Sequence, residues 1–137
     1  MRSIRRAICI AMMAAAVWGA GGPQLAGRIS GKQGVRNARQ WTIEVRNSGS
    51  DAALGARIGA VRFTQTSAGG GASCTPAIRH PRFPVELGDI PAGGTATASL
   101  TIDFRGCANR AQFTVEMDFS DSSGAVRGTL RRSNDYR

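Results

Sequence analysis

The residues that could support acid–base or nucleophilic chemistry in this sequence are few. The single histidine, His80, lies in Arg79-His-Pro-Arg82, between cations that disfavour its protonated form. A small hydrolase would need a carboxylate and the hydroxyl of Ser73 or Thr75 within hydrogen-bond reach of His80. The nucleophile elbow G-x-S-x-G, the P-loop and the G-x-G-x-x-G fingerprint do not occur in the sequence. We therefore predict that the protein is not an enzyme and takes no cofactor.

The carboxylates offer two further candidates. Asp103, Glu116 and Asp118 lie on outward positions of two alternating segments and would meet only if those segments were neighbours. Because like charges on opposed strands are destabilising, we expect arginines to be their partners. Asp118 and Asp121, with the hydroxyls of Ser120–Ser123, could hold calcium weakly, but their spacing matches no EF-hand loop. A hairpin turn is the favoured interpretation there, and we predict no metal site.

The N-terminal residues have the order of features that is typical of a secretory signal. A basic start, Met1–Arg6, precedes twelve mainly apolar residues, Ala7–Trp18, and the small residues Gly19–Gly22. An uncleaved membrane anchor is the alternative, but twelve helical residues are too short for a hydrocarbon core of about 30 Å. We predict a signal peptide over residues 1–21, cleaved between 19 and 26, and a secreted or periplasmic protein without a transmembrane span.

Cleavage would change both the charge and the cysteine count. The 137 residues include 18 Lys+Arg and 9 Asp+Glu, a net charge of +9, and loss of the three arginines of residues 1–21 leaves +6. Cys9 would also be lost, which leaves Cys74 and Cys107 as an even pair in an oxidising compartment. We predict a disulfide between them. Two free thiols or half of a metal site are the alternatives, and a single histidine makes zinc a poor fit.

The elements that position these residues are strands, because apolar residues recur with a period of two. Trp41, Ile43 and Val45 alternate with polar residues, and residues 97–104 and 112–119 follow the same pattern. Strands with one apolar face toward a core and one polar face toward water are typical of antiparallel sheets. In residues 54–63 the apolar residues change from one alternating phase to the other at Gly59, which predicts a bulge or bend there. Before Gly59 the apolar phase holds Leu54, Ala56 and Ile58, and after it Val61 and Phe63.

Turn signals divide the chain into short strands. Gly, Pro, Asn, Asp and Ser cluster at Asn47–Asp51, Ser67–Gly71, Pro91–Gly94 and Asp121–Gly124. We expect seven strands, at residues 28–33, 39–47, 55–66, 84–88, 95–104, 111–119 and 125–131. This spacing without helical periodicity predicts an all-β fold, an Ig-like antiparallel β-sandwich over residues 27–132 with a C-terminal tail at 133–137.

The order of these motifs resembles a known group of modules. A strand ends in an Asn-x-Gly turn (WTIEVRNSG), a long alternating strand follows (ARIGAVRFTQT), and a Leu-Gly-x-Ile-Pro-x-Gly turn leads into a Thr-rich strand (LGDIPAGGTATASLTIDF). Over about residues 38–131 this resembles the bacterial Ig-like modules of the CARDB and DUF11 type. The resemblance implies a non-catalytic extracytoplasmic building block. Such modules are often repeated, whereas this sequence shows one.

The predicted disulfide differs from the one in antibody domains, which joins two strands across the core beneath a tryptophan. Cys74 follows the Gly-rich loop, and Cys107 follows the strand that ends near Phe104. We therefore expect the bond to pin a long connection, residues 67–83, to the end of the sandwich. Trp41 is expected in the core.

The aromatic residues argue against two classes of ligand. Most lie on inward phases of strands, which leaves Phe83 and Tyr136 as the exposed candidates. Sugars and single-stranded nucleic acids are bound on several exposed aromatic faces. We therefore predict neither a carbohydrate-binding module nor specific nucleic-acid binding.

The basic residues are almost all arginine, with 17 Arg to one Lys, and they are dispersed among the acids. A dispersed cationic surface usually serves solubility. The predicted function is that of a structural or interaction module that contacts a protein partner through edge strands or loops. The alternative is electrostatic binding of acidic envelope polymers or a membrane surface. The candidate contacts for that alternative are Arg79, Arg82, Arg131 and Arg132. The oligomeric state is left open.

Overall fold

The computed structural model describes residues 21–134 and 137, and it describes side chains for 21–124 and 137. The predicted signal peptide therefore lies outside the described residues. The described elements are β1 (Leu25–Gln33), η1 (Arg36–Ala38), β2 (Arg39–Asn47), β3 (Ala53–Ser67), β4 (Ala77–His80), β5 (Val85–Ile90), β6 (Thr95–Asp103), β7 (Gln112–Asp121) and β8 (Gly124–Asn134).

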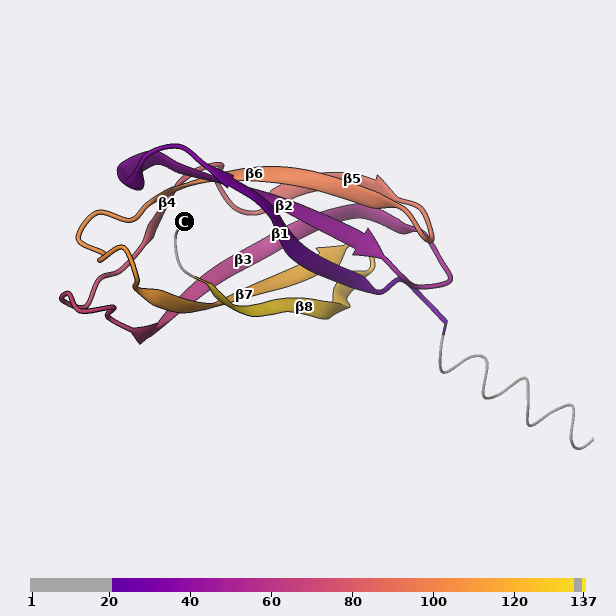
Figure 1. The fold of residues 1–137 in the computed structure, drawn as a ribbon. Helices are drawn as coiled ribbons and strands as arrows, with labels where there is room; N and C mark the ends of the chain where they lie inside the picture. Colours follow the sequence, from indigo (N-terminus) through magenta and orange to yellow (C-terminus); the bar gives the residue numbers. More distant parts are fainter. Residues whose placement is uncertain (1–20, 135–136) are drawn as a thin grey trace, which may run out of the picture.

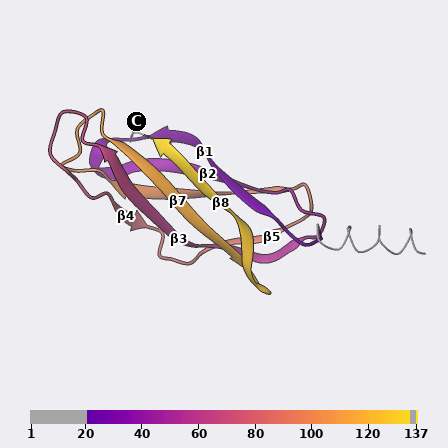
Figure 2. The same cartoon turned by 90° about the horizontal axis from the view of Figure 1, so that it is seen from below.

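The strands form two antiparallel sheets that pack face to face (Figure 1). The first sheet has the order β1-β2-β6-β4, and the second has the order β5-β3-β7-β8. In the view from below, β3, β7 and β8 run side by side, with β4 at the margin beyond β3 (Figure 2). The predicted all-β antiparallel sandwich is confirmed. Each expected strand is present, and β4 is an additional short strand within the segment that was expected to be a plain connection.

The core is built from the apolar phase of each strand. Along β2, Trp41, Ile43 and Val45 are fully buried, while Arg46 faces solvent. Along β7 the same alternation buries residues 113, 115, 117 and 119. A period of two on each sheet therefore places one face of both sheets in a shared core, and the expectation for Trp41 is confirmed.

Strand β3 departs from simple alternation at two glycines. Gly59 is the extra residue of a β-bulge, because Ile58 pairs with Phe119 and Ala60 pairs with Asp118, the next residue along β7. The predicted bulge is confirmed. The placement of Leu54 on the inward phase was wrong: its side chain is 53% exposed. Gly55 has φ +60° and the register with β5 shifts there, so the residue before Leu54 is buried instead.

The Asn-x-Gly turn after β2 contains a buried asparagine that ties both sheets together. The side-chain carbonyl of Asn47 accepts hydrogen bonds from the backbone N–H groups of Gln24 and Gly49. Its amide donates to the backbone carbonyls of Asp51 and Ile90, at 2.8 and 3.0 Å. Since every polar atom of this buried side chain has a partner, the motif closes one end of the sandwich.

Candidate functional site

An apolar cleft opens at the margin of the sandwich, between β3 of the second sheet and β4 of the first. Its volume is about 440 Å³. Its lining, which defines the β3–β4 cleft, is Gly59, Ala60, Val61 and Phe63 from β3, Thr75, Pro76 and Ile78 from β4 and the residues before it, and Phe83.

The cleft exists because the strand neighbouring β3 stops short. Strand β5 pairs with β3 only as far as Ile58, opposite Val85. From residue 59 to 67, β3 pairs with β7 on one side. In the part of the chain that the structure describes, no strand pairs with the other side of that stretch. Its backbone groups on that side have no partner in either sheet, beside an opening to the core.

The side chains of the cleft are an exposed continuation of the core. Val61, Phe63, Ile78 and Phe83 are half-buried and pack against the buried cluster. Phe83, expected to be an exposed aromatic, is half-buried: it packs against the core cluster and also lines the open cleft. Tyr136, the other candidate, lies outside the described residues.

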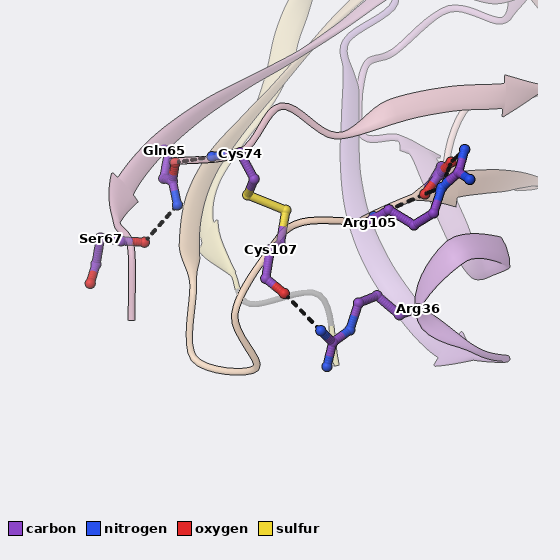
Figure 3. Close-up of a disulfide and its surroundings, with 7 residues drawn as sticks. Arg36, Gln65, Ser67, Cys74, Arg105 and Cys107 are labelled. Atoms are coloured by element: carbon purple, nitrogen blue, oxygen red, sulfur yellow. Dashed lines mark hydrogen bonds and ion pairs between the residues drawn. A yellow bond between two sulfur atoms is a disulfide. The ribbon is translucent and has the colours of Figure 1, made fainter. Parts of the chain in front are cut away.

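A disulfide fixes the segment that supplies one wall of the cleft. Cys74 and Cys107 are bonded, with Cα atoms 5.2 Å apart. The side-chain carbonyl of Gln65 accepts a hydrogen bond from the backbone N–H of Cys74, and Arg36 donates to the carbonyl of Cys107, both at 3.0 Å (Figure 3). The bond pins the connection after β3 to the end of the sandwich, as predicted, and it lies one residue before Thr75 of the cleft wall.

A buried carboxylate anchors β4 from its other side. Asp103, at the end of β6, takes the outward phase predicted for it, opposite to buried Ile102, yet it is only 5% exposed. It accepts hydrogen bonds from Arg79 of β4 and from the backbone and side chain of Arg105. The Arg79 guanidinium first, and then Arg105, hold the pKa of Asp103 well below its usual range. The two arginines cover the carboxylate, which is why an acidic side chain can be buried at this position.

Acidification should weaken this anchor. Since the pKa of Asp103 is lower in the folded protein than in the unfolded chain, its contribution is complete above the ordinary pKa, about 3.9, and declines as the pH falls through the folded value. We expect the unfolding free energy of Asp103→Asn to lie below that of the wild type at about pH 7 and the two to converge toward about pH 2. Urea denaturation across this range measures the difference. Asp51→Asn, an exposed carboxylate, is the matched control, and a gap that stays constant with pH would contradict the role of Asp103.

Two other carboxylates, Asp118 and Glu44, also pair with arginine, and for Asp118 this was expected. Arg62 donates to both carboxylate oxygens of Asp118, at 2.7 and 3.0 Å, and Arg28 donates to Glu44 at 2.8 Å. These hydrogen bonds lower the pKa of Asp118 and of Glu44. Asp103 does not approach Asp118, because β6 and β7 belong to different sheets.

The predicted hairpin turn after β7 is confirmed. Asp121 accepts hydrogen bonds from the backbone N–H and the hydroxyl of Ser123, at 3.0 and 2.6 Å, and Gly124 begins β8. Among the described residues, no group of three or more His, Cys, Asp or Glu side chains is placed to hold a metal ion.

The remaining candidate residues are placed as follows. His80 ends β4, and within the described side chains no hydrogen bond joins it to a carboxylate, to Ser73 or to Thr75. Arg79 forms an ion pair with Asp103. Arg82 is exposed, and it has no ion-pair partner among the residues whose side chains are described. The side chains of Arg131 and Arg132, the other two candidate polyanion contacts, lie outside the described part.

The sequence reasoning missed the cleft, although two signals pointed toward it. The phase change at Gly59 keeps Val61 and Phe63 on the core face of β3, and apolar Ile78 and Phe83 interrupt a segment with few other apolar residues. Within residues 21–134, the structure contains no helix long and apolar enough to cross a bilayer.

Comparison with known proteins leaves the family open. No protein-family model matches the chain, and no match was found among curated proteins. The structure supports the two-sheet antiparallel sandwich that the resemblance implied. The chain is therefore a small disulfide-bonded β-sandwich with an apolar cleft at its open margin.

Proposed function

We propose that the protein is a non-catalytic Ig-like interaction module, secreted or periplasmic, that acts through contacts with another protein in the envelope or outside the cell. The observation that carries this proposal is the β3–β4 cleft, where an unpaired strand edge lies beside half-buried apolar side chains. Unpaired backbone and accessible apolar surface are two features by which sheet proteins bind partners. The disulfide fits a protein that folds in an oxidising compartment.

The resemblance to CARDB and DUF11 modules supports the same function. The alternative, electrostatic binding of acidic polymers, has weaker support because Arg62 and Arg79 are already engaged by carboxylates. An arginine paired with a carboxylate presents little net charge to a polyanion.

Site-specific photocrosslinking tests the proposal. A benzoylphenylalanine residue would replace exposed Thr75, at the cleft, or exposed Thr97, on the outer face of the first sheet, in the protein expressed in its native host. We expect a defined adduct of higher mass with at least one of the two, because the module works by contact. Recovery of unlinked monomer from both positions would contradict the proposed function.

A further inference from the structure

The free stretch of β3 is long enough to act as a template for another strand. It runs from residue 59 to residue 67, and β7 occupies its opposite edge up to the pair of Ser67 with Gln112. Nine residues exceed the usual strand length of about five or six. An extended segment laid along this edge would form main-chain hydrogen bonds that the sandwich itself does not make.

The cleft gives such a segment a place for a side chain. In an added strand, alternate side chains point to the core side of the sheet. On that side lie Phe63 from β3, Ile78 from β4 and Phe83, around a space of about 440 Å³. This volume accommodates a large apolar side chain, and its burial would cover surface that is half-exposed in the isolated domain.

The charge around the cleft specifies the partner further. Residues 59–84 contain three arginines and His80 but no Asp or Glu. Arg62 and Arg79 are neutralised by Asp118 and Asp103, which come from other segments. Arg82, directly before Phe83, is exposed and is not paired with any described carboxylate. A partner segment that reaches Phe83 would therefore bind more tightly if it carried a carboxylate next to its apolar residue, because the carboxylate could pair with Arg82.

The same charge disfavours a second copy of this chain as the occupant. Two copies paired edge to edge along residues 59–67 would each bring an Arg82 without a described ion-pair partner, and each copy carries a net charge of +6 without residues 1–21. Repulsion between like-charged edges is a common way in which natural sheet proteins avoid such pairing.

We infer that the β3 edge and the β3–β4 cleft bind an extended acidic segment of another protein. The segment adds a strand to β3, places one large apolar side chain between Phe63, Ile78 and Phe83, and sets a carboxylate beside Arg82. This inference rests on the proposed function and names the site and the chemistry of its partner.

Two synthetic peptides test the inference on the protein with its disulfide intact. The acidic probe is acetyl-Thr-Val-Glu-Phe-Glu-Val-Thr-amide, and the basic probe carries lysine in place of both glutamates. We expect the acidic probe to bind about five- to tenfold more tightly at low salt, because Arg82 attracts a glutamate placed beside it and repels a lysine in the same position. We also expect its binding to slow amide exchange in residues 59–67. The inference would be overturned if the two peptides bound with equal affinity, or if neither bound up to about 1 mM. It would also be overturned if the acidic peptide slowed amide exchange only outside residues 59–67.

A matched pair of charge reversals locates the contact. Arg82→Glu should weaken the binding of the acidic probe about fivefold or more, whereas Arg46→Glu, at another exposed arginine on β2, should alter its affinity by less than about twofold. Both sites are on the surface, so both variants should fold. Equal effects of the two reversals would show general charge attraction and overturn the assignment to the cleft. An adduct at Thr97 alone, with no probe binding at β3, would retain the proposed function and reject this inference.

Discussion

Replacing both Cys74 and Cys107 by serine should lower the free energy of unfolding by about 3–4 kcal/mol. The bond joins residues 33 apart in sequence, and opening it restores the entropy of a loop of that length to the unfolded chain. Typical domains have a net stability of only about 5–15 kcal/mol, so the loss would remove a large share of the total. Urea denaturation of the two proteins under non-reducing conditions measures it.

The control for this experiment is Ser73→Ala, an exposed hydroxyl beside the bond, which should change stability by less than about 0.5 kcal/mol. The wild type in reductant should approach the double serine variant. If the double variant unfolded at the same urea concentration as the wild type, the bond would not stabilise the folded domain by constraining residues 74–107. The bond would then not anchor the wall of the cleft that follows Cys74.

Truncation of Phe104 to alanine should cost about 3–5 kcal/mol. Its ring is fully buried, and it lies 5.4 Å from the ring of Trp41, 6.1 Å from that of Phe63 and 5.9 Å from that of Phe113. Removing it leaves a cavity between the two sheets and takes away the aromatic contact behind the cleft. Thermal and urea denaturation both report this change.

The comparison variant for Phe104→Ala is Leu54→Ala, which truncates a large apolar side chain that is 53% exposed. It should cost less than about 1 kcal/mol, because little apolar surface is buried there. Similar losses for the two variants would mean that the aromatic cluster is not the centre of the core.

Alternation predicted the sheets well because burial on one face requires a period of two. β2 spans residues 39–47 in both the prediction and the structure, and the bulge at Gly59 followed from the phase change on either side of it. The disulfide followed from an even pair of cysteines. These features depend on local pattern or on residue counts, so the sequence alone was sufficient.

The features that were not predicted from the sequence depend on contacts between distant segments. Asp103 lies on a polar phase of its strand, and its burial arises because Arg79 of β4 and Arg105 cover its carboxylate. Phe83, in the connection between β4 and β5, is half-buried because it packs against the core cluster. The cleft itself results from where β5 stops pairing with β3, and that boundary depends on contacts between distant segments.

Amide hydrogen exchange of the isolated protein, resolved by residue with NMR, tests the free edge of β3 most directly. Strand β7 provides the internal reference, since residues 113–118 pair with β3 on one side and β8 on the other. We expect slow exchange throughout that stretch, whereas in residues 59–67 slow and fast amides should alternate, because every second N–H points away from β7. Uniformly slow exchange across residues 59–67 would show that the edge is already covered and would contradict the proposal that a partner strand binds there.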